Sequence, residues 1–125
     1  MRARLVRPAL FAAGLFACAA VQADERAFVT NQSAQTVSVV ALPQMAVLAT
    51  LAVAGKPAGV AAAPDGRRVY VSSPEGPFVT VLGTDPPVVL RQIALEGGPL
   101  GIAVHPSGKP LYVADWYAGR VFVVD

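Results

Sequence analysis

Short runs of aliphatic and aromatic residues alternate with clusters of proline, glycine and aspartate along most of the chain. Apolar runs of about four to eight residues bounded by turn-forming residues are typical of β-strands. In the middle of the chain they predict strands over 60–63, 68–72, 78–82 and 88–95. No segment after residue 23 has a convincing helical period. The pattern therefore predicts an all-β protein made of antiparallel meanders.

Two of these strands lack the strict alternation of a half-exposed strand. Residues 68–72 (RVYVS) and 78–82 (FVTVL) are apolar on both sides of the expected pleat. Such strands are covered on both faces. The turn between the first two predicted strands contains Pro64-Asp65-Gly66, in which proline fixes φ and glycine tolerates a positive φ.

The chain repeats itself at a constant interval. The tetrapeptides FVTN, YVSS and YVAD begin at Phe28, Tyr70 and Tyr112, so each copy starts 42 positions after the one before. Between positions 55 and 82, ten residues are identical to their counterparts one repeat later, and the matches include glycines and prolines in register. The repeated structural residues are Phe28/Tyr70/Tyr112, Gly59/Gly101 and Gly66/Gly108. A four-stranded unit repeated at this period is typical of a β-propeller blade.

These residues resemble the YVTN-type β-propeller repeats of secreted bacterial proteins. The name motif is similar at Phe28-Val29-Thr30-Asn31, and the Pro-Asp-Gly turn of that family stands at residues 64–66 and in weaker form at Pro106-Ser107-Gly108. The resemblance covers nearly all of the chain after residue 23. It implies a propeller fold. Some relatives accompany pyrroloquinoline-quinone-dependent alcohol catabolism or resemble propeller subunits of quinoprotein amine dehydrogenases.

The predicted strands do not complete a ring. Repeat units at about 24–56, 57–98 and 99–125 contain three, four and three strands, or about two and a half blades. Closed propellers have about four to eight blades. We therefore expect a partial β-propeller, a fragment of a longer one, whose ring is completed by missing blades or by oligomerisation.

The segment 1–23 has the features of a secretory signal. Arg2, Arg4 and Arg7 precede an apolar stretch over 9–20, and Val21-Gln22-Ala23 offers small residues for cleavage before Asp24. This predicts a periplasmic or secreted protein with no transmembrane segment after signal removal. An alternative is lipidation at Cys18, because residues 15–18 (LFAC) resemble a lipobox.

Removal of this segment changes the charge of the chain. The formal net charge is +2, but without three arginines the basic residues number 10 − 3 = 7 against 8 acidic residues, or −1. With no basic patch, a nucleic-acid partner is excluded. The one cysteine would leave with the signal, so we expect no disulfide and no cysteine ligand.

The candidate binding residues are those that break the repeat or end equivalent strands. Trp116 and Tyr117 follow Asp115, whereas the equivalent residues in the other units are not aromatic. Exposed aromatic side chains on loops commonly anchor ligands, although they also cover blade edges. Asn31, Ser73 and Asp115 end equivalent strands, where they could line a rim or form turn hydrogen bonds.

No catalytic constellation, metal-ligand spacing or cofactor motif is present in the sequence. His105, the single histidine, is expected at a strand end before the 106–108 turn. The leading hypothesis is a non-enzymatic module that binds an unknown protein or small ligand on the propeller rim, as an accessory to quinoprotein-linked oxidation. The alternatives are a fragment of a propeller enzyme, such as a lactonase or quinoprotein dehydrogenase subunit, with its active residues in missing blades, or a truncated reading frame.

Overall fold

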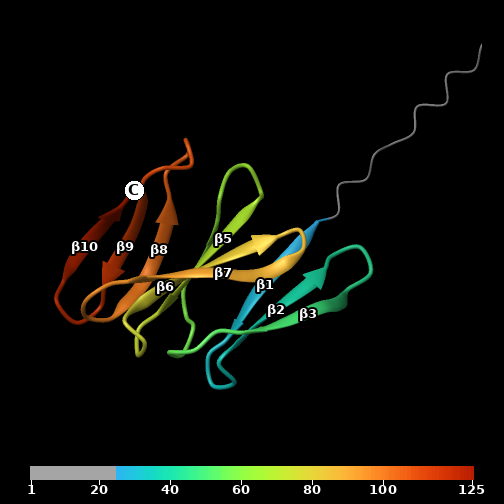
Figure 1. Ribbon diagram of the computed structural model, residues 1–125, viewed down its shortest axis with the longest axis horizontal. Helices are drawn as coiled ribbons and strands as arrows, with labels where there is room; N and C mark the ends of the chain where they lie inside the picture. Colours follow the sequence, from blue (N-terminus) through green and yellow to red (C-terminus); the bar gives the residue numbers. More distant parts are fainter. Residues whose placement is uncertain (1–24) are drawn as a thin grey trace, which may run out of the picture.

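The computed structural model describes residues 25–125, and within them the chain forms ten strands in three antiparallel sheets (Figure 1). The sheets are blade 1 (β1-β2-β3), blade 2 (β4-β5-β6-β7) and blade 3 (β8-β9-β10). The strands are β1 (Arg26–Asn31), β2 (Thr36–Ala41), β3 (Ala46–Ala52), β4 (Val60–Ala62), β5 (Arg68–Ser73), β6 (Phe78–Thr84), β7 (Pro87–Ala94), β8 (Pro99–Val104), β9 (Leu111–Asp115) and β10 (Arg120–Val124).

The hairpin turns follow the expected turn chemistry. Gly66 has a φ of 69°, and the carboxylate of Asp65 accepts a hydrogen bond from the backbone N–H of Arg67 at 2.9 Å. In the equivalent turn of blade 3, Gly108 has a φ of 90°. There the imidazole Nδ1 of His105 accepts from the N–H of Ser107 at 3.1 Å. His105 therefore lies just beyond the end of β8, as expected, and stabilises a turn.

Strand ends differ from the prediction by one or two residues. Ala63 was expected in a strand, but its N–H donates to the carbonyl of Arg68 and it belongs to the turn after β4. Strand β6 continues to Thr84, two residues beyond the predicted end. The difference arises because backbone pairing between β6 and β7 extends to Thr84 and Pro87, beyond the apolar run visible in the sequence.

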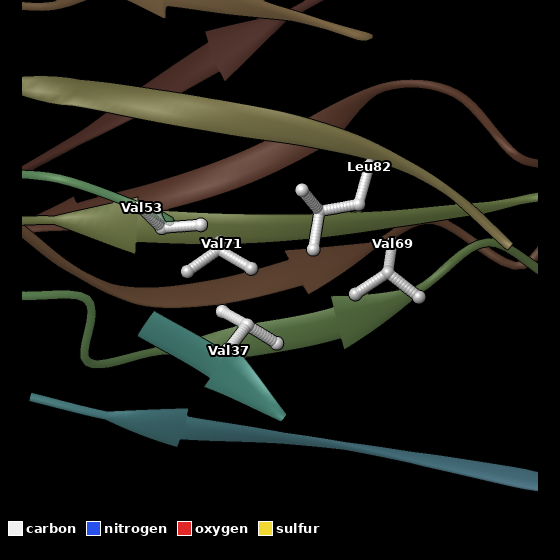
Figure 2. Packing of buried hydrophobic residues seen from close by; sticks show 5 residues of the cluster. All are labelled: Val37, Val53, Val69, Val71 and Leu82. Atoms are coloured by element: carbon white, nitrogen blue, oxygen red, sulfur yellow. The ribbon is translucent and has the colours of Figure 1, made fainter. Parts of the chain in front are cut away.

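The packing between blades 1 and 2 is an aliphatic layer. Val37 of β2 is fully buried with Val69 and Val71 of β5 and Leu82 of β6 (Figure 2). Val53, on the connection from β3 to β4, completes this cluster. The layer covers one face of blade 2.

The other face of blade 2 packs against blade 3. Val79 of β6 is fully buried with Leu111 and Val113 of β9, and Tyr70 and Phe122 pack at the edge of this cluster. Five consecutive residues of β6, 79–83, are buried. The weak alternation of β5 and β6 in the sequence thus correctly predicted strands covered on both faces.

The three sheets are arranged as blades around an axis. Strand β4 of blade 2 contacts β1 of blade 1 and β8 of blade 3. Strand β7, at the other edge of blade 2, contacts β3 of blade 1. This is the arrangement of a β-propeller, in which inner strands meet near the axis. The chain is all-β and forms a partial β-propeller of three sheets with three, four and three strands.

The predicted signal sequence and the lipidation site at Cys18 lie outside the described residues. Within residues 25–125, no helix is long and apolar enough to cross a membrane.

Candidate functional site

The strand ends define two rims. The turns at 32–35, 74–77 and 116–119 and the connections at 53–59 and 95–98 form rim A, toward the bottom of Figure 1. The turns at 42–45, 63–67, 85–86 and 105–110 form rim B, on the opposite side. All the candidate binding residues predicted from the sequence lie on rim A.

Trp116 and Tyr117 lie in the turn between β9 and β10 and are strongly exposed. Trp116 has 72% of its surface accessible and Tyr117 has 71%. The backbone N–H of Trp116 donates to the carbonyl of Gly98 at 2.9 Å, which ties this turn to the connection before β8. The turn thus presents two adjacent aromatic side chains from a backbone that is hydrogen-bonded to the neighbouring connection.

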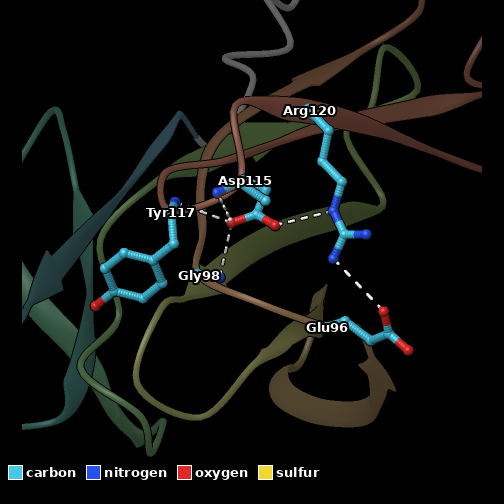
Figure 3. Close-up of polar contacts among 6 residues, drawn as sticks. Glu96, Gly98, Asp115, Tyr117 and Arg120 are labelled. Atoms are coloured by element: carbon cyan, nitrogen blue, oxygen red, sulfur yellow. Dashed lines mark hydrogen bonds and ion pairs between the residues drawn. The ribbon is translucent and has the colours of Figure 1, made fainter.

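Asp115 is the buried centre of this turn (Figure 3). Its Oδ1 accepts hydrogen bonds from the backbone N–H groups of Gly98 at 3.0 Å, Tyr117 at 3.0 Å and Ala118 at 3.3 Å. Its Oδ2 accepts from Nε of Arg120 at 3.0 Å. The carboxylate therefore joins the connection before β8, the β9–β10 turn and the first residue of β10.

These donors favour the ionised form of Asp115. The hydrogen bond from the backbone of Gly98 is the main cause that lowers the pKa of Asp115 from 3.8 to about 2. Burial opposes this change, while the bonds from Arg120, Ala118 and Tyr117 reinforce it. The carboxylate is committed to the turn and does not face outward on the rim.

Arg120 extends this network toward solvent. Its guanidinium lies 3.5 Å from a carboxylate oxygen of Glu96 and 4.7 Å from the centre of the Phe122 ring. The pair with Glu96 is mostly exposed and contributes little on its own. The bond to Asp115 orients the Arg120 side chain, as Figure 3 shows.

The ring of Tyr117 lies over Gly98. A Cβ at residue 98 would come within 2.6 Å of the tyrosine ring, so only glycine allows this contact. The equivalent positions in blade 2, one repeat earlier, are Lys56 and Glu75. These form an ion pair at 2.7 Å. Blade 3 thus replaces a charged contact on rim A by an aromatic one.

Asn31 and Ser73 occupy the positions equivalent to Asp115. The amide of Asn31 donates to the hydroxyls of Thr36 at 3.1 Å and Ser38 at 2.8 Å, both in β2 of the same hairpin. Ser73 is fully buried, and its hydroxyl has no hydrogen-bond partner among the described residues. The structure therefore places Asn31, Ser73 and Asp115 at equivalent strand ends, where the side chains of Asn31 and Asp115 form hydrogen bonds within their own blades.

One repeated polar contact was missed in the sequence. The hydroxyl of Thr30 donates to the backbone carbonyl of Ala58 at 3.0 Å, from blade 1 to the connection that enters blade 2. The hydroxyl of Ser72 donates in the same way to the carbonyl of Leu100 in blade 3. The two donors occupy equivalent repeat positions, and so do the two acceptors. We call this bond the inter-blade hydrogen bond; the third equivalent donor position holds Ala114, which has no hydroxyl.

The repeated aromatic and glycine residues have unequal surroundings. Phe28 and Tyr70 pack against the two core clusters, whereas Tyr112 is 38% exposed. A Cβ at Gly59 would overlap the carbonyl oxygen of Leu100, whereas at Gly101 the nearest neighbour is the Cβ of Ala114 at 3.4 Å. The repeat equivalents thus differ because, among residues 25–125, blade 3 lies beside blade 2 and no sheet lies against the far side of blade 3.

Rim B is hollowed and carries three exposed cationic side chains, those of Arg67, Arg68 and Lys109. A hollow of about 510 Å³ lies between the turns of blades 2 and 3, lined by Arg67, Arg68 and Lys109 among others. Another, of about 390 Å³, lies between blades 1 and 2 beside Arg26. Among residues 25–125 no group of three histidine, cysteine, aspartate or glutamate side chains is placed to hold a metal ion.

Fold and rim together define a β-propeller module. Solved propeller structures are similar to the chain: a hydrazine synthase from Kuenenia stuttgartiensis has 31% identity and a TM-score of 0.75 over 78% of this chain. The dihydro-heme d1 dehydrogenase NirN, in complex with DHE, has 20% identity and a TM-score of 0.70 over 78% of this chain.

A third similar structure is a functionally unknown protein from Desulfotomaculum acetoxidans DSM 771, with 19% identity and a TM-score of 0.65 over 82% of this chain. The chain spans 28%, 21% and 38% of the lengths of these three proteins, in the order given. No protein-family model and no curated protein matches the chain.

Proposed function

We propose that this chain is a secreted or periplasmic β-propeller module of the YVTN type, which binds a protein partner through Trp116 and Tyr117 on rim A. The observation that carries the proposal is their exposure of 72% and 71% on a turn whose backbone is fixed by Asp115. A rigid turn lowers the entropy lost on binding, and tryptophan and tyrosine are frequent anchors at protein interfaces.

A protein partner fits this surface better than a small ligand. The two aromatic side chains project from the end of a hairpin, whereas small-molecule sites are concave. The hollows of 390 and 510 Å³ belong to rim B, on the other side of the sheets. The proposed partner surface is therefore convex on this chain and requires a complementary groove on the other protein.

Export to the periplasm rests on the arginine-led apolar segment over 1–23 and the cleavage motif before Asp24. In that compartment the module would serve as an accessory to quinoprotein-linked oxidation, the role that the YVTN resemblance implies. The alternative anchorage at Cys18 gives the same compartment with a lipid attachment.

A second candidate function is that of a propeller section of an enzyme. The similarity to proteins named hydrazine synthase and dihydro-heme d1 dehydrogenase favours it. In that case the chemistry depends on residues outside this chain, and Trp116 and Tyr117 would contact another part of the same enzyme.

Trp116 offers a direct test, because it is the only tryptophan of the chain. Chain labelled with 5-fluorotryptophan should give one fluorine resonance, which broadens when periplasmic extract is added. The substitution Tyr117→Ala should raise the amount of extract needed for the same broadening by about tenfold or more. The reason is that aromatic anchors at interfaces contribute about 2 kcal/mol or more to binding.

Met45→Ala is the matched control, because Met45 is 76% exposed but lies in a turn of rim B. It should respond as the unsubstituted chain does. A resonance that is unchanged by extract, or an equal loss in the Met45 variant, would remove rim A as the binding surface.

A further inference from the structure

The basic side chains of residues 25–125 fall into two groups. Arg26, Lys56 and Arg120 form ion pairs with carboxylates at 3.7, 2.7 and 3.0 Å, respectively. The others form no ion pair with any residue of this part of the chain: Arg67, Arg68, Arg91 and Lys109. All of these unpaired side chains line two hollows between blades 2 and 3.

The two hollows share part of their lining. The larger one, of about 510 Å³, lies between the β4–β5 and β8–β9 turns of rim B and is lined by Arg67, Arg68 and Lys109. The smaller one, of about 90 Å³, is lined by Arg68, Lys109 and Arg91. Tyr70 lines both. We call the two hollows together the cationic furrow.

The strand register explains why these side chains gather. Tyr70 pairs with Val81 and Val81 with Arg91, so the three residues lie in one row across β5, β6 and β7. Tyr70 packs against the core cluster between blades 2 and 3, so this row is on the face toward blade 3. Arg68 precedes Tyr70 by two residues in β5 and therefore shares that face. Lys109 comes from the facing turn of blade 3.

The equivalent place between blades 1 and 2 serves as an internal comparison. Arg26 stands one repeat before Arg68, but it donates to the carbonyl of Thr84 and forms an ion pair with Asp85. Two further cations of the furrow have uncharged or acidic equivalents in blade 1: Glu25 for Arg67 and Ala49 for Arg91. The contact between blades 1 and 2 therefore satisfies its cation internally, whereas the contact between blades 2 and 3 does not.

The acidic residues beside the furrow do not neutralise it. Asp65 lines the larger hollow and Asp125 the smaller one, and neither forms an ion pair within residues 25–125. The carboxylate of Asp65 accepts its hydrogen bond from the backbone N–H of Arg67, inside the turn. An anion that enters the furrow therefore has no internal ion pair to displace.

We infer that the cationic furrow binds a small molecule with two or more negative charges, carried by phosphate or carboxylate groups. The planar guanidinium of arginine matches the oxygen atoms of both groups with two parallel N–H bonds. The larger hollow, at about 510 Å³, has the size of a small-molecule site, about 300–1,000 Å³. Because the cations come from separate segments, the sequence shows no basic patch, and the concave shape fits a small anion better than a nucleic acid.

Isothermal titration calorimetry of the full chain tests this site, at low ionic strength because salt screens exposed charges. Sodium pyrophosphate and trisodium citrate are the two probes, and at least one of them should bind at a single site. Binding of pyrophosphate alone identifies a phosphate ligand, and binding of citrate alone identifies a polycarboxylate. Arg68→Gln and Lys109→Gln, which alter different blades, should each weaken binding about tenfold or more, because each removes a charge-assisted contact.

Lys56→Gln is the matched control, because it removes the same charge from an exposed side chain on rim A. It should bind the probe as the unsubstituted chain does, and circular dichroism checks that every variant keeps its strands. No binding of either probe, or an equal loss in the Lys56 variant, would overturn the inference.

The anion site is independent of the proposed function on rim A. Tyr117→Ala should leave binding of the probe unchanged, and Arg68→Gln should leave the fluorine broadening by extract unchanged. Absence of anion binding with retained broadening would therefore remove the furrow as a site and leave the proposed function standing.

Discussion

Gly59→Ala is expected to lower the melting temperature by about 10 °C. The added methyl group would overlap the carbonyl oxygen of Leu100 and lie 2.7 Å from the hydroxyl of Ser72. One of these atoms is backbone, so relief requires that blades 2 and 3 move apart, which also breaks the inter-blade hydrogen bond from Ser72. Overpacking of this kind costs about 1–3 kcal/mol, and each kcal/mol shifts the melting temperature by about 4–8 °C in a domain of this size.

Gly101→Ala is the matched control, because it makes the same chemical change at the equivalent repeat position. Its methyl group would meet only the Cβ of Ala114 at 3.4 Å, an ordinary contact. Its melting temperature should stay within about 2 °C of the unsubstituted chain. Differential scanning calorimetry of both variants decides the matter, and equal losses would mean that the two glycines serve the blade itself and not the contact between blades.

Asp115→Ala should also lower the melting temperature by about 10 °C, because it leaves the N–H of Gly98 and the guanidinium of Arg120 without their acceptor. Asp65→Ala is the control, since Asp65 is exposed and accepts one bond, from Arg67. It should change the melting temperature by about 2 °C or less. Thermal unfolding followed by circular dichroism gives both values.

The same carboxylate gives the chain a specific acid sensitivity. Because the pKa of Asp115 is lowered from 3.8 to about 2 on folding, its contribution to stability is complete above pH 3.8 and is lost as the pH falls to about 2. Asp115→Asn cannot titrate and should lack this part of the acid transition. If the variant and the unsubstituted chain lose stability in parallel across that interval, the Asp115 network is not formed in solution.

The strands and the blade order could be predicted from the sequence because they depend on local signals. Proline and glycine mark the turns, and the repeat register of Tyr70 and Tyr112 places equivalent strands in equivalent sheets. The burial of β6 on both faces followed from its lack of alternation. The strand positions depend on each blade alone, and the burial of β6 requires only that some blade lies on either side of it.

The role of Asp115 could not be predicted in the same way. Its four donors come from residues 98, 117, 118 and 120, and the contribution of Gly98 depends on how the connection before β8 folds back over the turn. Nothing in the sequence distinguishes a rim carboxylate from one that holds a turn. The exposure of Trp116 and Tyr117, in contrast, agrees with their place in a hairpin turn.

Half of the inter-blade hydrogen bond is visible in the sequence. Thr30 and Ser72 both carry a hydroxyl at one repeat position, while the acceptor carbonyls of Ala58 and Leu100 belong to unlike side chains. Since backbone acceptors leave no trace in the sequence, only the donor half of the contact is visible. The difference between Gly59 and Gly101 is likewise invisible, because it depends on which blade lies beside each glycine.

The three sheets pack face to face as propeller blades, with blade 2 between the other two. Hydrogen–deuterium exchange of the backbone amides, followed by mass spectrometry of peptides, measures this most directly. Peptides that cover β5 and β6 should exchange slowest, and those that cover β3 and β10 should exchange faster, because the latter strands have open edges or exposed faces. Uniformly fast exchange, or protection of β3 and β10 equal to that of β6, would contradict the packing of blade 2 between its neighbours.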